Sequence, residues 1–207
     1  MMRHCRRSER GFSMSELLVV VAILGLIALI SVPALMQLMP QYRIRSAASE
    51  LAAGMRFIRQ KAMTTRIPWK VQLDATGERY AYARFTGTQV TDATLATTAN
   101  WQYYGRDART TPASESYWTR FSAIDLRTDS TNPFKDVNCD GYREVIFLRD
   151  GSISTAPNGA GCGGGAALTF TTQPTVVVAV NNSFVRYNRY RLGFTANGAL
   201  TITAAKE

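Results

Sequence analysis

Histidine is nearly absent from this chain of 207 residues: the only one, His4, lies within the first ten residues. Histidine is the side chain that most often moves protons in catalysis, and it is a common zinc ligand. The chain also has no G-x-S-x-G or H-E-x-x-H motif and no convincing pair of carboxylates for acid–base work. We therefore predict a protein that is not an enzyme, has no catalytic residues and binds no zinc.

Charge is missing from one long stretch, Leu17–Met36, whose 20 residues include a single hydroxyl, Ser31. As a helix rising ~1.5 Å per residue it would be roughly 30 Å long, about the thickness of the hydrocarbon core of a bilayer. Four arginines precede it, so the positive-inside tendency places the N-terminus in the cytoplasm. A secretory signal peptide is the alternative, but the run is too long and no small-residue cleavage site follows it.

One carboxylate, Glu16, stands directly before this apolar run. An ionised side chain costs roughly 2–3.5 kcal/mol near the centre of a membrane helix and is normally paired there. The stretch Arg10-Gly11-Phe12-Ser13-Met14-Ser15-Glu16 resembles the processing motif of the type IV pilin and type II secretion pseudopilin family. Members are cleaved after a glycine, methylated on the new terminal residue, and carry Glu at the fifth mature position and often Pro at the twenty-second. Gly11, Phe12, Glu16 and Pro33 match all four features in one frame.

The resemblance implies how the protein is processed and where it resides. Residues 1–11 would be a leader removed by a prepilin peptidase, and Phe12 would become the N-methylated terminus. Glu16 would neutralise the Phe12 amine of a neighbouring subunit. Pro33 would kink or loosen the helix so that neighbouring helices pack together. The implied location is the bacterial inner membrane, crossed once, with a periplasmic domain; an inner-membrane assembly platform would then build the subunit into a fibre with other pilins.

Helical periodicity resumes after Pro40, so we expect residues 12–40 and 41–66 to form two halves of one helix. The second half has an apolar face with spacings of three and four residues: Ile44, Ala47, Ala48, Leu51, Met55, Ile58 and Ala62. Pro68 disfavours helix at Ile67, which predicts an end near Thr64–Arg66. The apolar face must pack against something, and residues 67–207 are the available surface.

Beyond Pro68 the apolar period changes to two, which is typical of strands. We expect strands at Trp69–Asp74, Arg79–Phe85, Tyr117–Leu126, Glu144–Leu148, Ser152–Thr155, Leu168–Thr172, Val176–Val180, Tyr187–Phe194 and Leu200–Thr203. A long loop over 86–116 contains Trp101, Tyr103 and Tyr104, which either pin the loop to the domain or stack on a partner. The predicted fold class is α+β, the lollipop of type IV pilins: a long N-terminal helix, its first half transmembrane, packed on an antiparallel β-sheet domain.

Three further blocks resemble the GspH/FimT minor pseudopilin domain. Arg59-Gln60-Lys61-Ala62 loosely matches the end of its long helix. Val145–Ser152 matches its central block, with Arg149 in place of the usual proline, and Arg191–Ile202 matches its closing block. The resemblance therefore extends from Phe12 to about Ile202.

The formal net charge is +9, and removal of the leader leaves 20 basic and 14 acidic residues, a surplus of six. Such a surplus of positive charge favours binding to polyanions, or the charged side chains simply lie on a solvated surface. Of the three cysteines, Cys5 would leave with the leader. Cys139 and Cys162 would then reside in an oxidising periplasm, where a disulfide is the default expectation.

The segment 136–144 has the ligand spacing of an EF-hand loop. Asp136, Asn138 and Asp140 occupy positions one, three and five, a glycine occupies position six, and Glu144 occupies position nine. Phe147 stands where a bidentate glutamate is required. The segment is therefore either a partial calcium site or a turn rich in Asp and Asn, and we expect no other cofactor.

The function that these features favour is structural: a minor pilin or minor pseudopilin, at the tip of a type IV pilus or a type II secretion pseudopilus. The alternative is a DNA-binding minor pilin that acts as a receptor in DNA uptake. Arg189 and Arg191 would share one face of a strand with Tyr187, where they could hold a phosphate backbone. However, the Gly-Arg-x-Arg element of DNA-binding relatives is missing.

Overall fold

The structure is a computed structural model, and it describes the backbone of residues 12–74, 77–105, 118–120, 125–128, 134–157, 162, 167–171, 174–179 and 189–205. Within these ranges the side chains of residues 30, 33–38, 40, 120, 125–128 and 205 are not described. The chain divides into two compact units, Met1–Met39 and Pro40–Glu207. One helix, α1 (Met14–Thr65), has residues in both units.

Within the second unit, the predicted apolar face of α1 is buried along its whole length. All seven of its residues are at most 4% exposed, and Ala52 joins them. The helix ends at Thr65, as predicted, and Arg66 turns the chain away from it with a φ of 57°. The expectation of an amphipathic second half is therefore confirmed.

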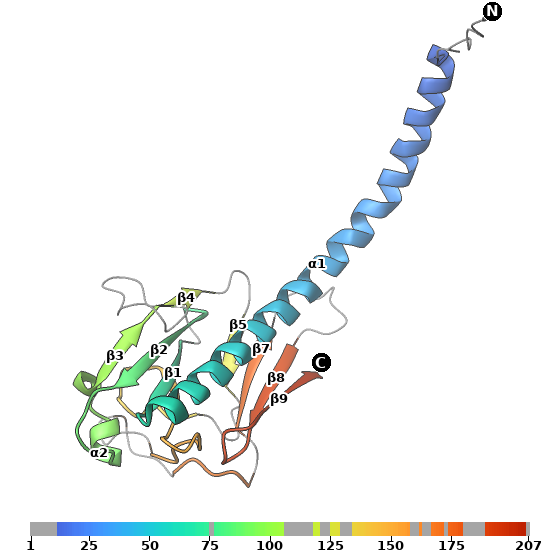
Figure 1. The fold of residues 1–207 in the computed structure, drawn as a ribbon. Helices are drawn as coiled ribbons and strands as arrows, with labels where there is room; N and C mark the ends of the chain where they lie inside the picture. Colours follow the sequence, from blue (N-terminus) through green and yellow to red (C-terminus); the bar gives the residue numbers. More distant parts are fainter. Residues whose placement is uncertain are drawn as a thin grey trace, which may run out of the picture. The chain divides into compact units, whose positions relative to one another are not determined.

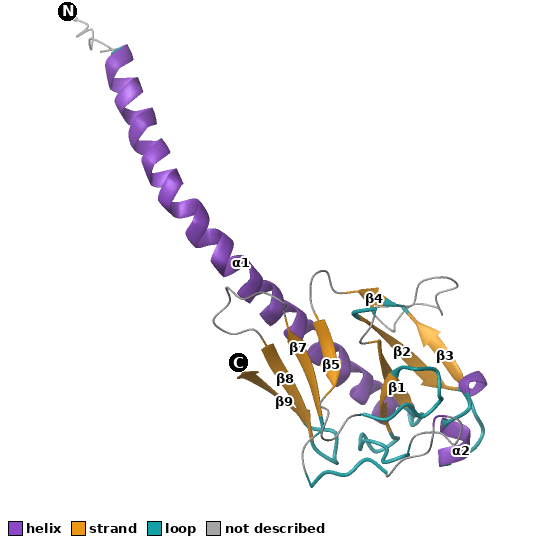
Figure 2. Ribbon diagram, turned by 180° about the vertical axis from the view of Figure 1, so that it is seen from behind, coloured by secondary structure: helices purple, strands orange, loops and turns teal. Residues whose placement is uncertain are grey.

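The described part of this unit also contains two antiparallel sheets (Figures 1 and 2). The first has the order β3-β2-β1-β6, with β4 also paired to β2: β1 (Trp69–Asp74), β2 (Arg79–Phe85), β3 (Trp101–Tyr104), β4 (Thr119–Arg120) and β6 (Arg143–Phe147). The second has the order β5-β7-β8-β9: β5 (Asp125–Thr128), β7 (Thr175–Ala179), β8 (Arg189–Phe194) and β9 (Leu200–Ala205). The fold class is α+β, as predicted, with two sheets in place of one.

The main core lies between α1 and one face of both sheets. Leu51 and Ile58 of α1 share a buried cluster with Val71 of β1, Val176 of β7 and Leu192 of β8. All three strand residues are fully buried. The helix therefore covers the apolar side of each sheet, and each sheet depends on it for that cover.

The opposite face of the first sheet is covered as well, because the chain folds back over it after β2. Residues 86–105, expected as part of a long loop, contain α2 (Asp92–Leu95), the 3-10 turn η1 (Thr98–Asn100) and β3. Trp101 pairs with Phe85 across β2–β3, its ring lies 5.3 Å from that of Phe85, and it is only 6% exposed. Trp101 thus pins this stretch to the domain, and the expectation of one loop over 86–116 was wrong.

Three expected strands also need correction. Tyr117–Leu126 is not one strand, because β4 joins the first sheet and β5 joins the second. Ser152–Thr155 makes only an isolated bridge, from Ile153 to Phe147. Leu168–Thr172 is not a strand over its described residues, where the Leu168 N–H donates to the Thr155 carbonyl. Ile153 and Leu168 are nevertheless buried, so in these two segments the apolar pattern indicated burial without strand pairing.

A glycine in α1 provides a test of this packing. A Cβ atom on Gly54 would lie 1.8 Å from Oη and 2.9 Å from Cζ of Tyr82, whose side chain is only 2% exposed. Alanine normally stabilises a helix by about 1 kcal/mol relative to glycine. We expect Gly54→Ala to destabilise the protein instead, by roughly 1–2 kcal/mol, because overpacking outweighs helix propensity. Urea unfolding measures this. Gly25→Ala, which has nothing within 4 Å of the new atom, is the control; equal stabilisation by both would contradict the packing.

Candidate functional site

The first turn of α1 contains the residues around the predicted processing point. Gly11 lies outside the described residues, and Phe12 is 76% exposed. The Ser13 carbonyl accepts hydrogen bonds from the N–H groups of Glu16 and Leu17, and the Ser13 hydroxyl oxygen accepts one from the Ser15 N–H. Serine before the helix with a glutamate three residues later suits a helix N-terminus. Glu16 is therefore favourably placed at the positive end of the helix dipole, in addition to any role between subunits.

The apolar side chains that follow have no cover within the unit Met1–Met39. All described side chains from Phe12 to Val32 are exposed, among them Leu17, Ile23 and Leu29. The hydroxyl of Ser31 donates to the Ile27 carbonyl at 2.8 Å, so its hydrogen-bonding need is met inside the helix. A continuous apolar surface of this kind requires an apolar partner or medium.

No helix in the described part of the chain reaches the length and apolarity of a membrane span. The run Leu17–Met36 includes side chains outside that part, and its span of the membrane stays a prediction. The backbone of α1 is helical through Pro33, whose side chain is not described. The kink expected at Pro33 likewise stays a prediction.

Arg59, which the sequence indicated only as part of the loose match at Arg59-Gln60-Lys61-Ala62, joins all three blocks that resemble the GspH/FimT domain. From α1 its Nε donates to the Gly151 carbonyl at 3.0 Å, and its terminal nitrogen donates to the Asn197 carbonyl at 2.7 Å. These carbonyls belong to two turns, after β6 and before β9, and lie 92 and 138 residues from Arg59. The blocks are thus one structural unit in space, in which the helix end clamps two turns.

The glycines of these turns leave room for the arginine. Gly151 and Gly198 have φ angles of 81° and 77°, which disfavour other residues. A Cβ atom on Gly198 would lie 2.1 Å from the Gly151 carbonyl oxygen and 2.8 Å from Nε of Arg59. The close approach of the turns and the clamp therefore depend on each other.

We expect Arg59→Met to lower the free energy of unfolding by roughly 2–3 kcal/mol, because two carbonyls lose a charged hydrogen-bond donor. Arg56→Met is the matched control, since Arg56 lies on the same helix and is exposed. Denaturant unfolding of both variants measures the difference. Equal, small effects would show that the clamp contributes nothing.

A second polar cluster lies on the far face of the first sheet, away from α1. All six residues of β1 are buried, so Lys70 and Gln72 have no access to solvent. Nζ of Lys70 pairs with Oε1 of Glu144 on β6, and both side chains are fully buried. Nζ also lies 4.7 Å from the centre of the Trp101 ring and 5.4 Å from that of Tyr103. The ion pair is thus enclosed by aromatic rings.

Burial dominates the electrostatics of this pair. Loss of solvent raises the pKa of Glu144 to about 7, although the charge and hydrogen bond of Lys70 act to lower it. The same burial lowers the pKa of Lys70, against the opposing charge of Glu144. Each group therefore depends on the other to keep its charge.

Three of the four predicted calcium residues, Asp136, Asp140 and Glu144, belong to the same cluster. The Asp136 carboxylate accepts hydrogen bonds from the N–H groups of Asp140 and Gly141, and Asp140 accepts from Gln72 and the Tyr142 N–H. Glu144 is paired with Lys70. The described part of the chain contains no group of three or more His, Cys, Asp or Glu side chains able to hold a metal ion. Calcium binding stays a prediction, while the hydrogen bonds are those of an Asp-rich turn.

The disulfide falls on this loop. Cys139 and Cys162 are bonded, as predicted, with their Cα atoms 5.1 Å apart and a sequence separation of 23. Cys139 has a φ of 60°. The bond fixes the turn between Asp136 and Tyr142 to a segment beyond β6, so it helps to keep the cover over Lys70 in place.

Removal of the lysine tests this electrostatic account. In Lys70→Met the buried Glu144 loses the partner that lowers its pKa, so its folded pKa should exceed the wild-type value of about 7. The unfolded value is about 4.5. Because the folded pKa lies above the unfolded pKa, the free energy of unfolding should be highest below pH 4.5. It should then fall by about 1.4 kcal/mol for each pH unit until the pH reaches the folded pKa. Urea unfolding from acid to mildly alkaline pH measures this. Lys61→Met, on half-buried Lys61 of α1, should keep the wild-type profile, in which the loss ends near pH 7, whereas in Lys70→Met the loss should continue above pH 7; matching profiles would contradict the account.

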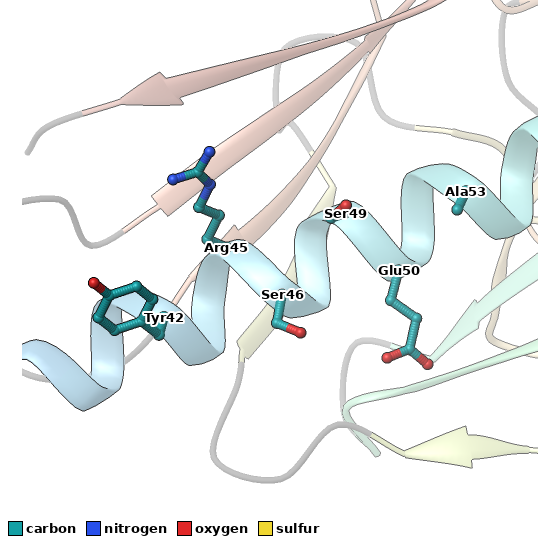
Figure 3. Close-up of a pocket in the computed structure, with 6 residues that line it drawn as sticks. All are labelled: Tyr42, Arg45, Ser46, Ser49, Glu50 and Ala53. Atoms are coloured by element: carbon teal, nitrogen blue, oxygen red, sulfur yellow. The ribbon is translucent and has the colours of Figure 1, made fainter.

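A pocket of about 640 Å³ is lined by residues of α1 (Figure 3). Its lining is Tyr42, Arg45, Ser46, Ser49, Glu50 and Ala53. Ser46 and Glu50 point to the same side of the helix, and Glu50 accepts a hydrogen bond from the Tyr80 hydroxyl at 3.2 Å. This lining offers neither a nucleophile paired with a base nor a cluster of carboxylates, so it does not resemble an active site.

The predicted DNA-contacting arginines lie on β8. Arg191 is exposed and Arg189 is half-buried, and they alternate with Tyr190 and Leu192, which pack toward α1. Tyr187, expected beside them, lies outside the described residues. Arg189 and Arg191 are two positions apart in β8, so they share one face of the sheet, as expected.

Comparison with known proteins supports the predicted processing motif around the first turn of α1. A family model for the prokaryotic N-terminal methylation motif matches residues 6–32. The chain carries this motif. "Type II secretion system protein H" of Xanthomonas campestris pv. campestris is 33% identical over 75 residues, which are 36% of this chain and 44% of that protein, so the match spans less than half of the relative. The resemblance to pilins and pseudopilins, drawn from Gly11, Phe12 and Glu16, is confirmed.

Two solved structures are also similar. The minor pseudopilin EpsH from the type 2 secretion system of Vibrio cholerae has a TM-score of 0.44 and 13% identity, covering 76% of this chain and 95% of that one. The type IV minor pilin FimU of Pseudomonas aeruginosa has a TM-score of 0.44 and 13% identity, covering 80% and 94%. DNA binding through Arg189 and Arg191 stays a prediction.

Proposed function

We propose that this protein is a minor pilin or minor pseudopilin, a structural subunit rather than an enzyme. The observation that carries the proposal is the methylation motif at residues 6–32, set at the start of a helix whose described apolar side chains up to Val32 are exposed. In this proposal a prepilin peptidase cleaves after Gly11, and Phe12 is methylated.

The exposed helix would have two successive environments. Leu17–Met36 is long enough to span the inner membrane, which would shield it before assembly. The assembly platform would then move it into a fibre, where helices of other pilins replace the lipid. The domain from Pro40 onward would remain in the periplasm, which agrees with the Cys139–Cys162 disulfide.

The likeness to type II secretion system protein H over 75 residues favours a secretion pseudopilus over a type IV pilus. In this proposal the subunit lies at the tip of the fibre, an expectation that the resemblance at residues 11–16 implies for a minor member of the family. Glu16 would make the decisive contact, because the amine of a processed Phe12 is a cation that needs a counter-charge in an apolar setting.

The test is fibre assembly in a bacterium that has the peptidase and the assembly machinery. We expect Glu16→Ala and Glu16→Gln to reach the membrane and to begin with N-methyl-Phe12, but to enter sheared fibres at least about tenfold less than wild type, since an unpaired charge costs more than ~1.4 kcal/mol there. Glu16→Asp, which keeps the charge, is the control. Wild-type protein that retains residues 1–11, or normal incorporation of Glu16→Gln, would refute the proposal.

A further inference from the structure

The buried pair Lys70–Glu144 has a geometry that goes beyond an ordinary ion pair. The two residues lie on neighbouring antiparallel strands, where Gln72 is directly opposite Glu144 and Lys70 opposite Ile146. Lys70 is therefore two residues from the Glu144 position on the same sheet face, within reach of a diagonal contact. Their side chains meet end to end, with no exposed atom on either.

The carboxyl group of Glu144 is held from both sides. One oxygen, Oε1, contacts Nζ of Lys70, and the other, Oε2, accepts a hydrogen bond from the Val137 N–H at 3.2 Å. The carbon Cδ thus lies beside an amine, with a backbone donor fixed on the far oxygen. A nucleophile near a carbonyl carbon and an N–H on its oxygen are the two elements that promote acyl transfer.

The surroundings favour a neutral product. Trp101 and Tyr103 flank Nζ, and Ala83, Val137 and Ile146 belong to the apolar cluster on this face. Two opposite charges in such a place lose their hydration, and a neutral group of similar shape does not bear this cost.

We propose that Lys70 and Glu144 condense within the folded protein to form an isopeptide bond. A proton first passes from the Lys70 ammonium to the Glu144 carboxylate, which leaves an amine and a carboxylic acid. The nitrogen lone pair attacks Cδ and forms the C–N bond, while the Val137 N–H stabilises the negative charge on Oε2. The bond from Cδ to the protonated oxygen then breaks, and this hydroxyl leaves with a second proton of the nitrogen as water. The product is a secondary amide, and no oxidant, reductant or cofactor is consumed.

The bond would join β1 to β6, across 74 residues of sequence. Because α1 leads directly into β1, a force on α1 would reach β6 through a covalent link as well as through the hydrogen bonds of the sheet. This inference does not depend on the proposed function.

Peptide mapping of the full-length protein, extracted in detergent, denatured, reduced and alkylated before digestion with trypsin, decides the question. A linked Lys70 resists trypsin, so we expect peptide 67–79 joined to peptide 144–149, lighter than their sum by one water. Fragmentation should place the link at Lys70 and Glu144.

Lys70→Arg is the control, since its guanidinium keeps the positive charge and the trypsin site but does not condense. It should release peptides 71–79 and 144–149 separately. Recovery of these same two peptides from the wild-type protein, with no joined species, would overturn the proposal and leave an unreacted ion pair.

Discussion

The fold depends on the burial of one face of α1. The inner faces of both sheets are apolar, and residues such as Val71, Val176 and Leu192 reach complete burial in a cluster that contains Leu51 and Ile58. The two sheets share no strand, so the helix is the element common to their cores. The helix that would anchor the protein is therefore also the helix that organises its domain, and the two roles occupy different parts of its length.

Arg59 and the two turns show how this helix also fixes loops. The guanidinium is planar and always charged, so it can serve two carbonyls in fixed directions. Gly151 and Gly198 allow the turns to come close enough to share it. Arg59, Gly151 and Asn197, one from each of the three GspH/FimT-like blocks, are thus joined by hydrogen bonds.

The far face of the first sheet is the least ordinary part of the molecule. A lysine and a glutamate are enclosed there by Trp101, Tyr103 and a turn that the disulfide holds in place. Burial, more than any neighbouring charge, shifts the pKa of both groups toward their neutral forms. The EF-hand-like spacing of Asp136 and Asp140 has a second interpretation, in which the two carboxylates interact with a buried lysine instead of a calcium ion. Lys70 supplies a positive charge close to both of them.

The sequence by itself determined the features that depend on local patterns. The motif at Gly11–Glu16, the apolar face of α1, its end at Thr65, and β1, β2 and the Cys139–Cys162 pairing could all be read from spacing and context. Periodicity reports which residues are buried, because burial repeats with the turn of the helix or the pleat of the strand. It does not report which strands are neighbours.

Tertiary structure alone decided the rest. The split of 117–126 between two sheets, the cover of Trp101 over β1, and the meeting of Arg59 with Gly151 and Asn197 all join residues far apart in the chain. Lys70 is the clearest case. Strand alternation places Lys70 on the other sheet face from Val71. Only the folding of residues 86–105 and 134–142 over that face buries Lys70, and this burial shifts the pKa values of Lys70 and Glu144.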